Sequence, residues 1–150
     1  MLTVDLPGRF QVLPGRPAVI LDVAHNPHAA AVLAQNLDNM GFFPATHAVF
    51  GMLRDKDIAG VIGRLGDRID HWHVAPTPGA RGCDASTLSA AVSAAAPAGA
   101  AVSEYRDLRA AYEGARERAG PDDRILAFGS FLTVAEVMRA IRARPAADAA

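Results

Sequence analysis

Apolar runs of strand length alternate with amphipathic helical patterns along most of this chain, and this alternation constrains the fold more than any other feature. The run A-V-I-L-D-V at 18–23 is apolar at nearly every position, as is typical of a strand buried on both faces of a parallel sheet. Residues 56–69 instead repeat apolar side chains with the i, i+3, i+4, i+7 spacing of a helix. Because alternating strands and helices are joined by right-handed crossovers, the sequence predicts a layered α/β fold.

The same two patterns predict the other elements. We expect two short β-like pieces at 2–6 and 10–13, strands at 18–23, 46–52, 71–76 and 124–131, and a weak strand at 100–105. We expect helices at 27–40, 56–69, 84–95, 107–119 and 133–144. The predicted fold is therefore a three-layer, mostly parallel, twisted sheet of about six strands flanked by about five helices, in a Rossmann-like arrangement.

Length and composition restrict the class of protein. The chain has 150 residues, of which 51% are hydrophobic and 21% charged, with a net charge of −1, so we expect 1–150 to form a single domain with one core. Its basic residues are not clustered into a face for nucleic acid, and no stretch reaches the ~18 apolar residues of a membrane span. The single cysteine, Cys83, excludes an internal disulfide and favours a cytoplasmic location.

Polar residues gather where the predicted strands end. The carboxyl ends of parallel strands share one edge of the sheet, and ligands of open α/β sheets bind beyond that edge. The residues concerned are Asp22 and His25; Arg54, Asp55, Lys56 and Asp57; Thr77 and Arg81; and Gly129, Ser130 and Thr133. Loops are usually polar in any case, which explains part of this pattern.

The stretch I-L-D-V-A-H-N-P-H at 20–28 is the most unusual of these strand ends. Asn26 suits the N-cap of a helix and Pro27 its first position. The amides near 28–30 would then lie at a helix N-terminus, where an anion can bind.

The acidic and imidazole groups nearby need separate interpretations. Asp22 ends an apolar run, so its carboxylate must lie at the sheet edge or accept hydrogen bonds, and carboxylates in this place often accept from ribose hydroxyls. His25 and His28 have no third ligand beside them in the sequence, so we predict no metal ligands. His71 and His73 alternate along a strand, which favours structural roles.

Several catalytic motifs are absent from the sequence. It contains no G-x-x-x-x-G-K-[ST], no G-x-G-x-x-G, no H-E-x-x-H and no G-x-S-x-G. No nucleophile is paired with a base. A catalytic chain of this kind would hold only half of a site.

Four motifs carry a family resemblance: P-G-R at 7–9, L-D-V-A-H-N-P at 21–27, F-G-M-L-R-D-K-D at 50–57 and F-G-S-F-L-T-V at 128–134. In this order and on this β/α pattern they resemble the C-terminal domain of folylpolyglutamate synthase/dihydrofolate synthase, in the Mur ligase family. The resemblance covers nearly the whole chain. It departs at Val23, where glycine is frequent in relatives.

The resemblance implies a fragment of an ATP-dependent, ADP-forming amide ligase. In such enzymes ATP converts a carboxylate of dihydropteroate or folate into an acyl phosphate, which the amine of glutamate attacks. A larger N-terminal domain carries the phosphate loop, most of the Mg²⁺ site and the folate site. The present chain would close over ATP and bind glutamate, would be inactive alone, and would have its own N-terminal domain as its partner, without nucleic acid or membrane.

Site residues follow from the same motifs. Arg9 matches the arginine that reaches the ATP phosphates, and Asp22 matches the carboxylate that holds the nucleotide. His25 matches the histidine near the incoming glutamate, so Arg9 and His25 are the expected catalytic residues. Lys56 and Ser130 match, with His25, the residues that bind glutamate.

Other interpretations of these residues remain open. Taken alone, Lys56 is a solvated helix start, Ser130 a helix cap, and Arg9 a hinge arginine in a surface salt bridge. The chain also fits a Mur-type cell-wall amino-acid ligase domain, a non-catalytic nucleotide- or anion-binding module, or a purely structural domain. R-D-K-D at 54–57, together with L-P-G-R-F at 6–10, favours folate.

Overall fold

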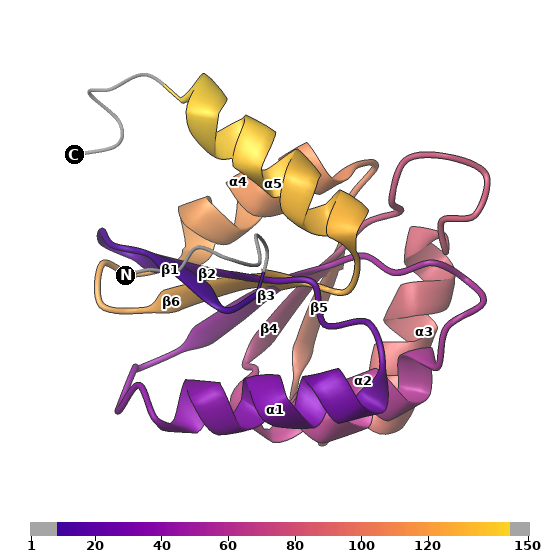
Figure 1. Ribbon diagram of the computed structural model, residues 1–150, viewed down its shortest axis with the longest axis horizontal. Coiled ribbons are helices and arrows are strands. Elements are labelled where there is room, and N and C mark those ends of the chain that lie inside the picture. Colours follow the sequence, from indigo (N-terminus) through magenta and orange to yellow (C-terminus); the bar gives the residue numbers. More distant parts are fainter. Residues whose placement is uncertain (1–8, 145–150) are drawn as a thin grey trace.

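The computed structural model describes residues 9–144, so the strand predicted at 2–6, and Pro7 and Gly8 of the P-G-R motif, lie outside the described residues. The described strands are β1 (Gln11–Leu13), β2 (Ala18–Asp22), β3 (Thr46–Phe50), β4 (His71–Val74), β5 (Ala101–Glu104) and β6 (Arg124–Phe128). The described helices are α1 (Pro27–Asp38), α2 (Ile58–Leu65), α3 (Ala85–Ala95), α4 (Leu108–Arg118) and α5 (Phe131–Ala143), with a short 3-10 helix, η1 (Gly66–Arg68), after α2. Figure 1 shows their arrangement.

The strands form one six-stranded sheet in the order β1-β2-β6-β3-β4-β5. β1 runs antiparallel to β2, and the other neighbouring pairs are parallel. β6, the last of them in chain order, lies between β2 and β3, with Phe128 in register with both Asp22 and Phe50. The carboxyl ends of these three strands are therefore level and adjacent, at the point where the strand order breaks and α/β sheets bind ligands.

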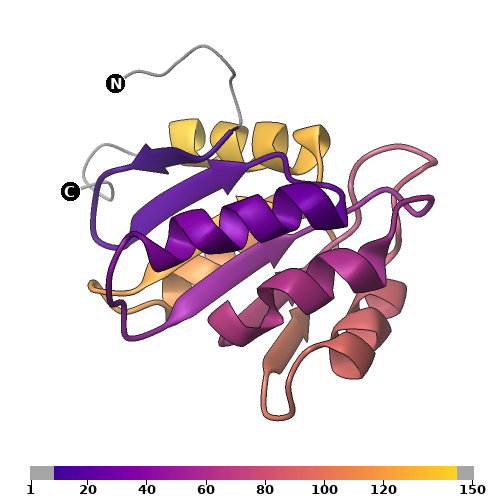
Figure 2. The same cartoon turned by 60° about the horizontal axis from the view of Figure 1, so that its bottom comes forward.

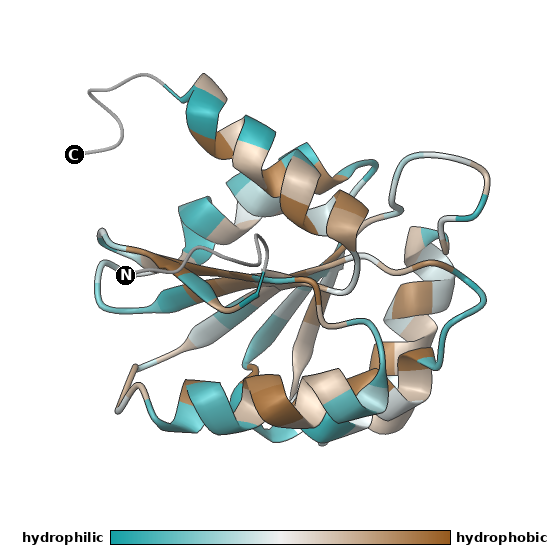
Figure 3. Cartoon of the chain, viewed as in Figure 1, coloured by the Kyte–Doolittle hydropathy of each residue, from teal (hydrophilic) through white to brown (hydrophobic). Residues whose placement is uncertain are grey.

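Helices cover both faces of the sheet, so the molecule has three layers (Figure 1). α1, α2 and α3 pack on one face with Phe50 and Trp72, and Figure 2 brings these helices forward. α4 and α5 pack on the other face with Val49 and Ala75. Because successive residues of a strand point to opposite faces, each central strand serves both cores. In Figure 3 the helices alternate brown, hydrophobic residues with teal, hydrophilic ones, as expected of helices that bury one face.

The predicted fold class is confirmed, and the differences lie at element ends. The last helix begins at Phe131 rather than at 133, because Ser130 caps it. The second helix begins at Ile58, because Asp57 caps it, and it tightens into η1 from Gly66. Every described α-helix has a capping side chain that accepts a bond from an amide three residues later; the caps are Asn26, Asp57, Asp84, Asp107 and Ser130. In residues 9–144 no helix combines the length and the apolar character needed to span a bilayer.

Candidate functional site

A small cavity opens where β2, β3 and β6 end. Its volume is about 190 Å³, and its lining residues are His25, Leu53, Lys56, Gly129, Ser130 and Phe131. The structure therefore brings together His25, Lys56 and Ser130, three residues that the sequence places in three separate motifs.

The apolar wall of the cavity was not predicted. Leu53 and Phe131 supply it, and the Phe131 side chain is 67% exposed. A large apolar residue directly after a site serine, at the exposed start of a helix, is the sequence signal that would have identified Phe131.

Ser130 is buried and its hydroxyl is almost fully engaged. Its Oγ accepts the Thr133 amide at 3.0 Å and lies 3.0 Å from the Thr133 hydroxyl oxygen. The Thr133 hydroxyl donates its own hydrogen to the Gly51 carbonyl oxygen at 2.8 Å, so Ser130 must be the donor to Thr133. The one capacity that remains on Ser130 is an oxygen lone pair, which suits a ligand that donates, such as an amine.

His25 is exposed at the mouth of this cavity and has a defined tautomer. Its Nδ1 lies 3.0 Å from the Val23 carbonyl oxygen, which can only accept, so Nδ1 carries the proton. In the neutral ring Nε2 is therefore an acceptor. The bond to Val23 also orients the ring from the end of β2.

Lys56 is half-buried and lies between two carboxylates, neither of which is free. The Asp57 carboxylate accepts the Gly60 amide at 2.9 Å as the cap of α2. The Asp55 carboxylate accepts from the Arg81 guanidinium at 2.8 Å, and that hydrogen bond lowers the pKa of Asp55. Lys56 thus lies immediately before the cap rather than in the helix start that its sequence position first indicated.

Asp22 lies outside the cavity and has a structural role. Its two carboxylate oxygens accept the amides of Phe10, at 3.1 Å, and Ala24, at 2.8 Å. Burial raises the pKa of Asp22, against the opposing effects of these two hydrogen bonds and of the Arg9 charge. Of the two options that the sequence left for this carboxylate, hydrogen bonding is confirmed. Arg9, exposed and electrostatically coupled to Asp22, does not line the cavity either.

The helix start at Pro27 offers less to an anion than the sequence indicated. The Ala29 amide donates to the Asn26 side chain at 2.8 Å, and the Ala30 amide donates to the Asn26 carbonyl at 2.9 Å. The N-cap prediction for Asn26 is confirmed, and this capping removes two of the three amides expected to hold an anion. His28 is exposed on α1 and does not line the cavity.

Two other features, a larger hollow and the single cysteine, do not pair a nucleophile with a base. A larger hollow of about 520 Å³ lies at the opposite edge of the sheet, between η1 and the loop before β5, and its acidic residues are Asp67 and Asp70. The thiol of Cys83 is buried in the core, and burial raises its pKa, so it is a poor nucleophile.

Comparison with known proteins identifies the family of this site. The family model of the Mur ligase, glutamate ligase domain matches residues 8–131. The chain belongs to this family. The resemblance drawn from the four motifs is thereby confirmed.

Relatives of this ligase domain agree with the assignment. The dihydrofolate synthase/folylpolyglutamate synthase of Escherichia coli is 40% identical over 139 residues, covering 93% of this chain and 31% of that protein. A probable bifunctional folylpolyglutamate synthase/dihydropteroate synthase of Haloferax volcanii is 38% identical over 130 residues, covering 87% of this chain and 15% of that protein. The chain therefore spans about a third or less of the length of these curated relatives.

Solved structures match the fold of the ligase domain. E. coli FolC in complex with DHPP and ADP superposes with a TM-score of 0.85 at 40% identity, covering 93% of this chain and 32% of that one. A bifunctional folylpolyglutamate synthase/dihydrofolate synthase with Mn, AMPPNP and L-glutamate bound gives 0.81 at 42% identity, covering 92% and 32%. Those relatives bind nucleotide, and the second also binds Mn and glutamate.

The rim carboxylates of the ligase domain do not fit a magnesium ion. Asp22 already accepts hydrogen bonds from two backbone amides. Asp55 accepts one from the Arg81 guanidinium, and Asp57 accepts one from the first turn of the helix that it caps. A hard cation requires several uncommitted oxygens at one point.

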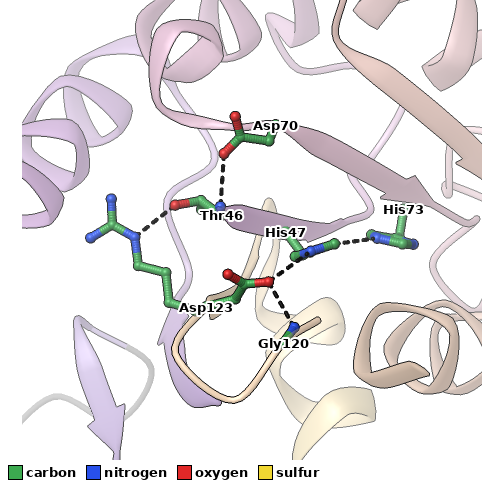
Figure 4. A network of polar contacts seen from close by, with 7 residues as sticks. Thr46, His47, Asp70, His73, Gly120 and Asp123 are labelled. Carbon is green, nitrogen blue, oxygen red and sulfur yellow. Dashed lines mark hydrogen bonds and ion pairs between the residues drawn. The ribbon is translucent and has the colours of Figure 1, made fainter. Parts of the chain in front are cut away.

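A cluster of buried histidines at the amino end of β3 and β4 was not predicted as a unit. Figure 4 shows His47 between His73 and Asp123. His47 Nε2 lies 3.7 Å from an Asp123 oxygen, His47 Nδ1 lies 3.1 Å from His73 Nε2, and His73 Nδ1 lies 2.9 Å from the Tyr105 hydroxyl. The two shorter contacts join neutral rings and a phenol by hydrogen bonds, and the Asp123 carboxylate faces His47 at a longer distance.

His71 completes this cluster, and the nitrogens of His47, His71 and His73 lie within 4.8 Å of one another. The rings of His71 and His73 are stacked, with centroids 4.1 Å apart and planes 9° apart. Their nitrogen lone pairs therefore lie in two nearly parallel, separate planes and do not meet at one ion about 2 Å away. The arrangement suits neutral, hydrogen-bonded rings, and the structural roles predicted for His71 and His73 agree with it.

Proposed function

We propose that residues 1–150 form the C-terminal, glutamate-binding domain of a cytoplasmic, ATP-dependent, ADP-forming amide ligase of the folylpolyglutamate synthase/dihydrofolate synthase type. The convergence of His25, Lys56 and Ser130 on one cavity of about 190 Å³ carries this proposal. Drug-sized ligands occupy cavities of about 300 Å³ or more, so this one suits an amino acid rather than a folate or a nucleotide.

The three polar residues suit two groups of glutamate, a carboxylate and the amino group. The Lys56 ammonium binds a carboxylate. The free lone pair of Ser130 accepts from the amino group, which fixes its direction. Nε2 of neutral His25 takes a proton from that ammonium, so that the nitrogen lone pair becomes available for attack.

Arg9 and Asp22 would serve the nucleotide. ATP supplies the phosphoryl group that converts a substrate carboxylate into an acyl phosphate with release of ADP; the amine then forms the amide and phosphate leaves. The fixed charge of Arg9 stabilises negative charge on the phosphates. The remaining lone pairs of Asp22 accept from ribose hydroxyls, while its bond to the Phe10 amide holds the segment that carries Arg9.

The domain alone lacks the phosphate loop and the folate site, so it should not turn over. The test compares the isolated chain with the same chain joined to its N-terminal domain, measuring ADP formation with glutamate and dihydropteroate or folate. We expect ADP and amide only from the joined protein. ATP hydrolysis or folate extension by the isolated chain would overturn the proposal.

Lys56 gives a second, direct test because it is the only lysine in the sequence. Lys56→Met in the joined protein should raise KM for glutamate at least tenfold, with KM for ATP unchanged, since a charge-assisted contact is lost. Arg64→Met, which removes an exposed cation from α2, is the matched control. Preference for another amino acid over glutamate in the unmodified enzyme would support the cell-wall ligase alternative instead.

A further inference from the structure

Two loops at the carboxyl edge of the sheet are joined like a short antiparallel ladder. The Cys83 amide donates to the Met52 carbonyl at 2.9 Å, and the Arg54 amide donates to the Arg81 carbonyl at 2.9 Å. Between these bonds, Leu53 and Gly82 form an antiparallel bridge. The loop after β3, which carries Lys56, is therefore held against the loop after β4.

Side chains strengthen this ladder. The Arg54 guanidinium donates to the Ala80 carbonyl at 2.6 Å. Gly82 lies so close to Thr77 that a Cβ there would come within 2.4 Å of the Thr77 carbonyl oxygen. The second loop thus has a fixed path that brings the Arg81 side chain beside Asp55.

The ion pair between Arg81 and Asp55 has a consequence for the residue next to it. Asp55 is bound by Arg81 at 2.8 Å and Asp57 is engaged as a helix cap, so neither carboxylate forms an ion pair with Lys56. The Lys56 charge acts on Asp55 only as a minor contribution, after Arg81, to the lowered pKa of that carboxyl. In the part of the chain that the structure describes, Lys56 forms no ion pair. Its ammonium is left for the cavity.

We propose that Arg81 is a positioning residue of the amino-acid site: it holds the Asp55 carboxylate away from Lys56, which keeps the ammonium available for an anionic group of the substrate. This inference rests on the proposed role of Lys56 in binding glutamate. Arg81 itself does not line the cavity. Without it, Asp55 would turn to Lys56 and compete with the substrate.

The effect should be moderate, because the pair is exposed: the Arg81 and Asp55 side chains are 64% and 56% accessible. Exposed pairs change an equilibrium by about fivefold at most. In the joined ligase, Arg81→Gln should therefore raise KM for glutamate about three- to fivefold and leave kcat and KM for ATP unchanged. Arg81→Lys retains a cation for Asp55, so its KM for glutamate should lie between the values of the parent and of Arg81→Gln.

The deciding variant is the double substitution Asp55→Asn with Arg81→Gln. Once the carboxylate is gone, nothing competes for Lys56, so KM should return to within about twofold of the parent value. The Asp55→Asn variant alone should have a KM for glutamate near the parent value. Arg16→Gln is the matched control, since Arg16 and Asp122 form an exposed pair of similar length, 2.9 Å, at the opposite edge of the sheet.

The outcomes separate this inference from the proposed function. A double variant as impaired as Arg81→Gln would show that Arg81 contacts the substrate or only braces the loop, and the inference would fall. The same follows if Arg81→Gln leaves KM unchanged while Lys56→Met raises it. If Lys56→Met itself leaves KM for glutamate unchanged, the proposed function fails first.

Discussion

Ser130 shows how one side chain can cap a helix and line a cavity at the same time. As the cap of α5 it accepts the Thr133 amide, and as a donor it completes a hydroxyl chain that reaches the Gly51 carbonyl. These contacts fix the direction of its free lone pair. The sequence allowed Ser130 to be either a helix cap or a binding residue; the structure shows the cap, and the cap directs the free lone pair that the proposed binding role needs.

Replacing Ser130 by alanine should therefore have two effects. Loss of the cap should lower the free energy of unfolding by about 1 kcal/mol, and loss of the acceptor should raise KM for glutamate in the joined ligase several-fold. Asp84→Ala removes the equivalent cap of α3, away from the cavity, and should give the same stability loss without the KM change. Urea unfolding and steady-state kinetics measure the two effects. Equal KM values for glutamate in both variants would show that Ser130 acts only as a helix cap.

At the scale of elements, the turn from β6 into α5 depends on Gly129. Its φ is +119°, and a Cβ there would lie 2.2 Å from the Gly51 carbonyl oxygen at the end of β3. This close approach lets β6 and β3 end side by side and presents Ser130 to the cavity. The glycine of the F-G-S motif is thus required by the backbone, independently of any ligand.

Gly129→Ala should lower the free energy of unfolding by about 3 kcal/mol, because it combines a disfavoured φ with a backbone clash. Gly63→Ala, in the middle of α2 with nothing within 4 Å of the added methyl group, should instead raise it by about 0.5–1 kcal/mol. Thermal or urea unfolding of the isolated chain measures both changes in stability. An unchanged midpoint for Gly129→Ala would contradict the close approach of the two strand ends.

The sequence predicted most elements because their signals are local. Apolar periodicity located the strands and helices, and Asn26 marked its own helix start. The insertion of β6 between β2 and β3 was not predictable, since strand order depends on contacts between distant segments rather than on any local pattern. The same limit hid the pair of His47 and His73, whose contact joins two strands. Phe131 was overlooked because it lies within an apolar pattern that fits a core equally well.

For the whole molecule, the buried histidines link stability to pH. Burial, reinforced by the charges of His71, His47 and Arg118, lowers the pKa of His73 to about 3. The pKa values of His47 and His71 are also lowered, by burial first, although Asp123 and Asp70 oppose this at His47. The unfolded chain takes up these protons near pH 6.5, and the folded chain does not. Stability is therefore fully present above about pH 6.5 and is lost as the pH falls toward 3.

His73 alone should cost about 2 kcal/mol of unfolding free energy between pH 7 and pH 5, at about 1.4 kcal/mol per pH unit for each proton. His73→Gln removes that proton and should flatten the pH dependence by this amount. His28→Gln, which replaces an exposed histidine of α1, is the matched control. Urea unfolding at several pH values measures both. A slope in His73→Gln equal to that of the parent would show that His73 titrates normally in the folded chain.

The position of β6 also has a consequence for synthesis on the ribosome. β2 and β3 emerge early, yet the strand that pairs with both begins only at Arg124. Until it has been made, one edge of β2 and one edge of β3, each five residues long, have no partner, and such edges are prone to mispairing. The sheet and the cavity beside it therefore cannot be completed before β6, the last strand in chain order, has been synthesised.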